Sequence, residues 1–360
     1  MPNSKITLTK IAKKAGVSVT SVSRVVHAPH LTSRETQERV HQAIGLLGFN
    51  ASVFKPYSQL PYSKKILIID NQLITGSLIN KGIESKAKEL GYKLLYLRFF
   101  YFNEQEIQQI ISYTINHQVD GILLINDSPY LLALQQYQHA LPPIVLVNHF
   151  SLYFPCVYFD HLSNAYQATQ YLTDKGHRKI AILLGSLDKD ETQHLVQGYQ
   201  QALKRLNSLS SDNYMVYDCI NYSASYKALK RLMQLPFPPT AIICCDHLNL
   251  NYIDREKLFV DDKFDETIST DSAICGVIDQ CRIMNINIPA DLSLVQFIHH
   301  KGHKPYSPLN HICAVYKPLV EMGEEAISLL LNLQHPDYRG NNKRLISTEI
   351  SNRHSTATLL

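Results

Sequence analysis

The chain has 360 residues, which is enough for two or three domains whose cores need neither disulfide bonds nor metals. Hydrophobic residues make up 45% and charged residues 18%, so the composition excludes a disordered, collagen-like or coiled-coil protein. The net charge of +4 is uneven: residues 1–60 hold eight Lys and Arg against two acidic residues, whereas the other 300 residues hold 27 bases and 29 acids. The positive excess therefore lies at the N-terminal end.

Cysteine usage indicates a reducing compartment, and hydropathy indicates a chain that does not span a membrane. The seven cysteines form no Cys-x-x-Cys pair, and Cys244 and Cys245 are adjacent in an apolar run, which is typical of buried thiols. No run approaches the roughly 18–20 apolar residues that cross a bilayer, and lysines interrupt any apolar leader. We expect a soluble, cytoplasmic protein with no membrane partner.

The segment ITLTKIAKKAGVSVTSVSRVV (6–26) predicts two short helices joined by a turn. Thr7 can cap the first helix, Gly16 permits a tight turn, and Ser18 can cap the second helix. Apolar side chains recur at helical spacing in the first helix, at Leu8, Ile11, Ala12 and Ala15. A third helix is expected from the capping box Thr32-Ser-Arg-Glu35, with apolar residues that close a small core at Val40, Ile44 and Leu47.

The second helix has one face suited to the DNA major groove. Val22, with Val25 or Val26, can pack on the first helix, which leaves an outward face of Thr20, Ser21, Ser23 and Arg24. Arginine can bond guanine bidentately, and serine and threonine can hold phosphates. A helical hairpin with a purely structural role is the alternative. The turn glycine, the two caps and the absence of acids before Glu35 favour DNA binding.

The segment 50–64 follows this all-α helix-turn-helix domain (1–49) and contains two prolines without periodicity, so it is expected to be a linker. From 65 to 360 short apolar runs alternate with amphipathic segments. Strands are expected at 66–70, 93–100, 121–126, 144–148, 157–160, 180–185, 215–218 and 241–245. Helices are expected near 77–90, 104–117, 130–140, 162–175, 192–207 and 223–235. This alternation predicts two α/β lobes with parallel sheets.

Two later segments do not follow the alternation. Residues 246–269 carry seven acids and three bases, and we expect a long surface insertion there that could also cover a cleft. The histidines of HHKGH (299–303) lack a fourth ligand nearby in sequence, so a polar loop is expected and no metal site. No phosphate-binding glycine loop, Gly-x-Ser-x-Gly elbow or His-Glu-x-x-His helix occurs. We therefore expect no enzyme and no cofactor.

The helix-turn-helix, the capped third helix, LGF (47–49) and the two-lobed remainder resemble the LacI/GalR family of transcription regulators over nearly the whole chain. Segments such as VYFDHLSNAYQATQYLTDKGHRKIAIL (157–183) and LPFPPTAIIC (235–244) resemble the cytidine-repressor branch of that family. The resemblance implies a periplasmic-binding-protein-like (type I) pair of lobes and a homodimer on a pseudo-palindromic operator. The implied boundaries are about 65–157 with 291–316 for lobe N, and about 158–290 with 317–360 for lobe C.

By the family's pattern, bases are read by Val19, Thr20 and Arg24. Phosphate contacts are implied for Thr7, Ser18, Ser23, His27, Ser33 and Thr36. The linker departs from the pattern, because the family's minor-groove leucine is Ser58 here and Pro56 would interrupt a hinge helix. We therefore expect a tether between the domains. Other apolar linker residues could substitute as wedges, namely Phe54, Tyr57 or Leu60.

The implied effector site is altered more heavily. The family's stacking aromatic falls at Ile74 or Thr75, its arginine is Leu195 and a late aspartate is Ile298. Asp160 and Asp271 remain, and an aspartate can accept two ribose hydroxyls. Three alternatives stay open for the lobes: a nucleoside effector such as cytidine, another ligand or protein partner, or a dimerisation scaffold alone.

The resemblance also implies repression of genes for nucleoside uptake and catabolism, with the cyclic-AMP receptor protein as a DNA-bound partner. A cytosolic ligand-binding protein or enzyme with a vestigial DNA-binding segment is the alternative from another functional class.

Overall fold

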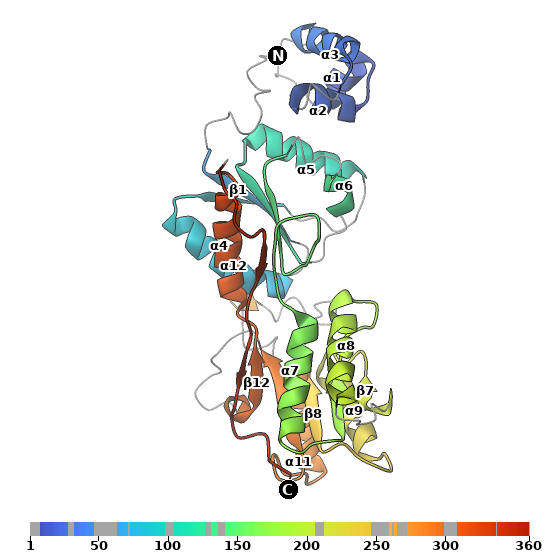
Figure 1. Cartoon of the computed structure of the whole chain (residues 1–360). Helices are drawn as coiled ribbons and strands as arrows, with labels where there is room; N and C mark the ends of the chain where they lie inside the picture. Colours follow the sequence, from blue (N-terminus) through green and yellow to red (C-terminus); the bar gives the residue numbers. More distant parts are fainter. Residues whose placement is uncertain are drawn as a thin grey trace. The chain divides into compact units, whose positions relative to one another are not determined.

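The computed structural model describes residues 8–27, 32–46, 63–70, 73–97, 104–126, 131–135, 141–205, 212–245, 259–260, 263–264, 272–298, 308–335 and 337–359. The chain divides into two compact units. The first comprises Met1–Tyr158 and Val320–Arg344, and the second comprises Phe159–Leu319 and Leu345–Leu360. Figure 1 shows the chain coloured by sequence position, from blue at the N-terminus to red at the C-terminus. The α/β part of the first unit is called the N-lobe below, and the second unit is called the C-lobe.

Three short helices begin the first unit: α1 (Leu8–Ala15), α2 (Val19–His27) and α3 (Arg34–Leu46). The expected helix-turn-helix is thus present. Its core is small and aliphatic, made of Ile11, Ala12, Ala15, Val22, Val25, Val40 and Ala43.

The N-lobe is built on a six-stranded sheet with the order β13-β5-β4-β3-β1-β2. Its strands are β1 (Lys65–Asp70), β2 (Lys93–Leu97), β3 (Gly121–Ile125), β4 (Ile144–Val147), β5 (Cys156–Tyr158) and β13 (Lys343–Leu345). Its helices are α4 (Leu73–Glu89), α5 (Glu104–His117), α6 (Leu131–Gln135) and α12 (Leu319–Asn332). Strands β1 to β5 pair in parallel, and the central ones are buried along their whole length, as expected when helices cover both faces.

The C-lobe repeats this plan with the strand order β14-β12-β11-β8-β6-β7. Its strands are β6 (Ile180–Leu183), β7 (Met215–Val216), β8 (Ala241–Cys244), β11 (Ser293–Ile298), β12 (Cys313–Tyr316) and the antiparallel β14 (Glu349–Ser351). Its helices are α7 (His161–Asp174), α8 (Asp190–Lys204), α9 (Tyr222–Met233) and α11 (Ser272–Ile283). One core lies under α7 and α8 and the other under α9 and α11, so helices cover both faces of the sheet (Figure 1).

The predicted fold class is confirmed, but the expected lobe boundaries near the C-terminus are wrong. The segment 291–316, expected in lobe N, supplies β11 and β12 to the C-lobe sheet. Most of α12, together with β13, expected in lobe C, belongs to the first unit. The physical reason is local, because β8, α11 and β11 form a crossover between adjacent parallel strands, and consecutive strands usually pair in one sheet.

Part of the acidic insertion 246–269 is described. The two-residue strands β9 (Phe259–Val260) and β10 (Lys263–Phe264) pair in an antiparallel hairpin. The expectation that the insertion covers a cleft falls on residues outside the described ranges.

Candidate functional site

The helix-turn-helix is held by the turn between α1 and α2. Gly16 has φ +65°, a left-handed conformation that favours glycine. Ile11 in α1 and Val22 in α2 are fully buried against one another's helices, as predicted, and Val25 is 2% exposed. The packing fixes which face of α2 remains in solvent.

Hydroxyl side chains cap the next two helices. Ser18 Oγ accepts a hydrogen bond from the backbone N–H of Ser21 at 2.9 Å, which confirms the predicted cap of α2. At α3 the cap is Ser33, whose Oγ accepts from the N–H of Thr36 at 3.3 Å. The expectation of a capping box starting at Thr32 is therefore wrong by one residue, because the helix begins at Arg34.

The predicted DNA-contacting residues differ in their exposure to solvent. Arg24 is exposed on α2, and Thr20 and Ser21 are partly exposed on the same helix. Val19 is partly buried and packs against the small core, so it contributes to folding as well as lying at the start of α2. Thr7 and the side chains of Ser23 and His27 lie outside the described residues.

Sequence reasoning missed Arg39 of α3. Its Nε donates to the carbonyl oxygen of Ala15 at 3.1 Å and its Nη2 donates to that of Gly16 at 2.9 Å. These acceptors are at the carboxyl end of α1, where carbonyls lack helical partners. Arg39 thus fastens α3 to the turn, and no local sequence pattern reveals a bond spanning 24 positions.

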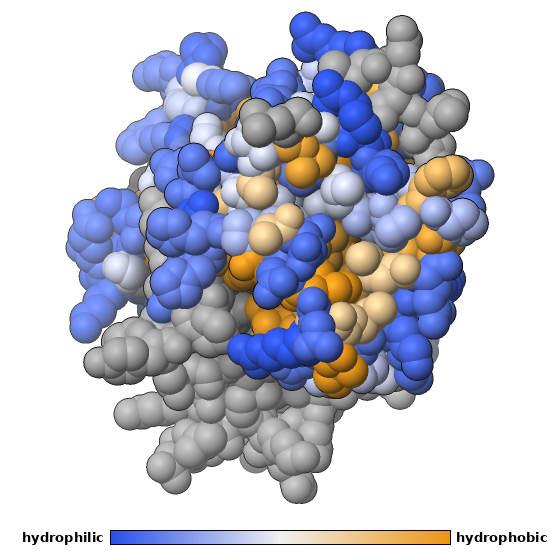
Figure 2. Space-filling view, turned by 90° about the horizontal axis from the view of Figure 1, so that it is seen from below, coloured by the Kyte–Doolittle hydropathy of each residue, from blue (hydrophilic) through white to orange (hydrophobic). Residues whose placement is uncertain are grey.

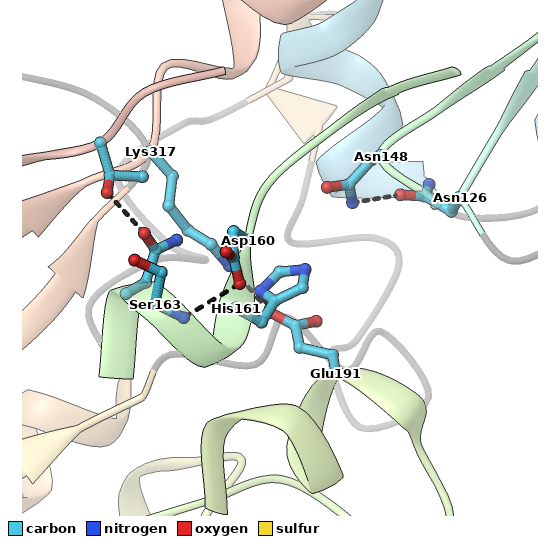
Figure 3. Close-up of polar contacts among 9 residues, drawn as sticks. Asn126, Asn148, Asp160, His161, Ser163, Glu191 and Lys317 are labelled. Carbon is cyan, nitrogen blue, oxygen red and sulfur yellow. Dashed lines mark hydrogen bonds and ion pairs between the residues drawn. The ribbon is translucent and has the colours of Figure 1, made fainter. Parts of the chain in front are cut away.

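A second polar cluster lies in the C-lobe, at the carboxyl ends of parallel strands (Figure 3). Lys317 directly follows β12, and its Nζ donates to Glu191 Oε1 in the first turn of α8 at 2.8 Å. His161 Nδ1 lies 3.2 Å from the same carboxylate oxygen. Open α/β sheets bind ligands at this end of their strands, which makes the cluster the candidate effector site of this lobe.

Lys317 carries an ammonium group in a mostly apolar setting. Its side chain is only 7% exposed, and Nζ lies 5.8 Å and 6.0 Å from the ring centroids of Phe159 and Phe297. A buried cation needs a nearby carboxylate or aromatic faces, and here it has both. Glu191 is 33% exposed, so this carboxylate is the part of the cluster that a solvent-borne ligand can reach.

Asp160, the predicted ribose-binding residue, has a role in the fold. Its Oδ1 accepts a hydrogen bond from the N–H of Ser163 at 3.0 Å and caps α7 (Figure 3). The other two predicted effector positions, Asp271 and the side chain of Thr75, lie outside the described residues.

The departures from the family's pattern are built into the core. Leu195 is 1% exposed, and Ile298 at the end of β11 is 3% exposed. Neither position presents a polar group, whereas Lys317, Glu191, His161 and Asp160 do so in the described part of this end of the C-lobe.

Each lobe also holds a buried amide donor without a hydrogen-bond partner. In the N-lobe, Asn148 Nδ2 donates to Asn126 Oδ1 at 2.8 Å, and Asn126 Nδ2 is unsatisfied although the residue is 4% exposed (Figure 3). In the C-lobe, Asn164 Oδ1 accepts from Thr348 Oγ1 and its buried Nδ2 is unsatisfied. Buried polar groups are usually bonded, so such donors are candidates for contacts with a polar ligand.

The described ranges contain neither a metal-binding cluster nor a membrane-spanning helix. No group of three or more His, Cys, Asp or Glu residues there is arranged to hold a metal ion, and the histidines of 299–303 lie outside these ranges. All seven cysteines lie in the described ranges, none of them in a disulfide bond, and six are buried. None of the helices in the described parts has the length and apolar character that crossing a bilayer requires.

Family models match most of the chain. One, described as "Bacterial regulatory proteins, lacI family", matches residues 7–52. Another, described as "Periplasmic binding proteins and sugar binding domain of LacI family", matches residues 77–248, and a "Periplasmic binding protein-like domain" matches 267–356. The chain belongs to the LacI family.

LacI-family repressors of known function are similar along almost the entire length. The chain is 29% identical to the HTH-type transcriptional repressor CytR of Escherichia coli strain K12, with 98% of this chain and 97% of the relative covered. It is 23% identical to the repressor PurR of Escherichia coli O139:H28, with 91% and 89% covered. These relatives and the LacI helix-turn-helix confirm a DNA-binding transcriptional repressor and not an enzyme.

Solved LacI-family structures share the fold. CcpA of Lactococcus lactis has a TM-score of 0.59 at 22% identity, with 81% of this chain and 98% of that chain covered. A sugar-binding LacI-family regulator of Escherichia coli in complex with phosphate has a TM-score of 0.66 at 17% identity, with 83% and 100% covered.

Proposed function

We propose that this LacI-family repressor binds a pseudo-palindromic operator as a homodimer, with α2 in the major groove of each half-site. The observation that carries the proposal is the exposed face of α2, where Arg24 stands one turn from Thr20 above a buried valine face. Arginine reads guanine through two parallel hydrogen bonds. That readout requires a recognition helix whose opposite face is packed against the core of its domain.

Phosphate contacts follow from the two capped helix starts. The hydroxyls of Ser18 and Ser21 lie 2.8 Å apart at the start of α2, and those of Ser33 and Thr36 lie 2.8 Å apart at the start of α3. Helix N-termini attract anions, and hydroxyl groups can turn from each other to a phosphate oxygen. These four residues therefore fix the register of the domain on the duplex, as expected for phosphate contacts.

An anisotropy titration tests DNA recognition directly. Operators are selected from a random duplex pool, and binding to selected and random duplex is compared over a range of salt concentrations. Arg24→Ala should weaken binding to the selected site by about 1–3 kcal/mol and leave binding to random duplex nearly unchanged. Arg282→Ala is the matched control, because Arg282 is exposed in the C-lobe and pairs with Asp279 at 2.9 Å. Equal affinity for both duplexes in the unchanged protein would refute the proposal.

For the effector, a nucleoside such as cytidine is proposed, in line with repression of nucleoside uptake and catabolism genes. The unsatisfied amides of Asn126 and Asn164 support a polar ligand. The test is a calorimetric titration with cytidine together with a thermal unfolding series. Asp160→Asn, which keeps an oxygen for the α7 cap, separates ligand contact from capping. Absence of heat and of thermal stabilisation would favour the alternative, another ligand or a protein partner.

Self-association and the DNA-bound partner complete the proposal. Figure 2 shows hydrophobic residues gathered among hydrophilic ones on the face seen from below. Exposed large apolar side chains of the C-lobe include Tyr222, Phe237 and Ile283. Exposed apolar surface of this kind supports an interface between subunits. Light scattering tests the dimer, and titration on promoter DNA with and without the cyclic-AMP receptor protein tests that cytoplasmic partnership.

A further inference from the structure

Three exposed lysines border one edge of the N-lobe sheet. Lys64 precedes β1, Lys93 begins β2 and Lys88 lies in the last turn of α4. The N–H of Lys93 donates to the carbonyl oxygen of Lys64 at 2.7 Å. The Lys64 ammonium lies 3.7 Å from where a Cβ on Gly91 would stand, in the turn between Lys88 and Lys93. We call Lys64, Lys88 and Lys93 the lysine edge.

The carboxylates next to the lysine edge are already engaged. Asp120 Oδ1 accepts from the backbone N–H and the hydroxyl of Ser63 at 2.8 Å and 3.0 Å, and its Oδ2 accepts from the N–H of Lys64 at 2.7 Å. Glu89 is paired with Lys86 at 2.9 Å. Within the described residues, the three lysines form no ion pair with an acid. Their positive charge is therefore available to an external anion.

The lysine edge lies where the chain enters the lobe from the DNA-binding helices. Asp120 fastens Ser63 and Lys64 to the start of β3, so the entry point is fixed on this edge. Sixteen residues, 47–62, separate the end of α3 from Ser63. The connection from Leu46 to Ser63 spans at most about 61 Å when fully extended. With α2 bound to an operator, Ser63 therefore lies no farther than about 61 Å from the carboxyl end of α3.

We infer that the lysine edge is a second DNA-contacting surface, which binds the phosphate backbone flanking each half-site. Ammonium groups bind phosphates as point charges without reading sequence. Each such contact releases counterions from the DNA, so the affinity falls as the salt concentration rises. The charge complementarity and the tether entry point select duplex DNA as the partner. The inference rests on the proposed operator binding and adds to it a contact outside the helix-turn-helix.

The experiment compares two duplexes that carry the same selected operator. One ends at the half-sites, and the other extends about one helical turn beyond each. Lys64, Lys88 and Lys93 are replaced together by Gln in the full-length protein. The control replaces Lys204, Lys227 and Lys230, exposed lysines of the C-lobe, by Gln, which removes the same charge. Light scattering checks that both variants keep the oligomeric state of the unchanged protein.

The unchanged protein should bind the longer duplex more tightly, by about fivefold or more at low salt, and with a steeper salt dependence. The lysine-edge variant should lose this gain, and its slope of log K against log salt should become shallower by about 0.9 for each lost phosphate contact. Replacement of the same three lysines by Arg should restore it. The C-lobe control should behave as the unchanged protein.

The two proposals fail in different ways. If the unchanged protein prefers no selected operator over random duplex, the proposed function fails and the inference falls with it. If it prefers the operator but gains nothing from flanking DNA, the inference alone is overturned. An equal loss in the C-lobe control also overturns it, because net charge and not the lysine edge would then set the affinity.

Discussion

Single glycines decide how closely the helices of the C-lobe approach. A Cβ on Gly198 of α8 would overlap the carbonyl oxygen of Leu162 in α7, and a Cβ on Gly276 of α11 would overlap that of Tyr222 in α9. Such crossings leave no space for a methyl group, because the opposing atoms belong to backbone that cannot rotate away.

Gly198→Ala should lower the unfolding free energy by about 1–3 kcal/mol, since overpacking outweighs the gain of about 1 kcal/mol in helix propensity. Thermal unfolding measures the change. Gln197→Ala on the exposed face of the same helix is the control and should leave the melting temperature nearly unchanged. An equally stable Gly198 variant would show that the helices move apart at little cost.

His177 gives the C-lobe a pH dependence. Burial lowers the pKa of His177 below 6.5, the hydrogen bond to Ala357 opposes this shift, and the nearby Lys175 adds to it. The carbonyl oxygen of Ala357 can only accept, so Nε2 donates to it at 3.2 Å and Nδ1 faces the hydroxyl of Thr240 at 2.9 Å. Because burial outweighs the hydrogen bond to Ala357, the unfolded chain takes up a proton at His177 more readily than the folded one.

The contribution of neutral His177 to stability should be fully present above the unfolded pKa, near pH 6.5, and should be lost as the pH falls from there toward the lowered folded pKa. Melting temperatures from about pH 7.5 to about pH 5.5 measure it. In His177→Gln the decline on acidification should be shallower than in the unchanged protein. Parallel curves for the two proteins would exclude His177 as the cause.

At the scale of elements, an ion pair joins the end of β12 to the start of α8. Glu191→Gln leaves the ammonium of Lys317 buried without its carboxylate and should cost about 1–3 kcal/mol, at the lower end because Glu191 is 33% exposed. Lys317→Met fills the same volume without a charge and should cost less. Denaturant unfolding of both variants checks the order. If Lys317→Met lowered the unfolding free energy more than Glu191→Gln, the contacts of the lysine side chain would matter more to stability than the burial of an unpaired charge.

Elements were foreseeable wherever one periodicity covers them. The apolar runs that become β3, β4, β6 and β8 and the helix-turn-helix were predicted near their observed positions, because strands buried on both faces are uniformly apolar. The start of α3 was displaced by one residue, since Thr32 and Ser33 can both cap and only the backbone decides between them.

Contacts between distant residues were not foreseeable. Lys317 and Glu191 are 126 positions apart, and Arg39 reaches back 23 and 24 positions to the turn after α1. Asp160 was expected as a ligand contact, yet its local sequence equally suits a helix cap, which is what the structure contains. The lobe boundaries near the C-terminus, which the family resemblance implied, were wrong because β8 and β11 pair in one sheet through the crossover of α11.

At the scale of the whole molecule, the number of residues between α3 and the N-lobe limits how the two DNA-binding segments of the proposed dimer can be spaced. With sixteen residues between α3 and Ser63, and with Ser58 at the position of the family's hinge leucine, the protein should tolerate operators whose half-site spacing varies by several base pairs. Selection on operator libraries that differ only in spacing measures this. A single permitted spacing would contradict the tether and indicate an ordered linker on DNA.

The chain passes between its two units three times, at 158/159, 319/320 and 344/345. Its last segments are shared, because β13 lies at the edge of the N-lobe sheet and β14 lies at the edge of the C-lobe sheet only a few residues later. No single proteolytic cut can release either lobe as an intact piece, whereas the DNA-binding helices form one continuous stretch. A premature stop near residue 340 would therefore remove an edge strand from both lobes at once.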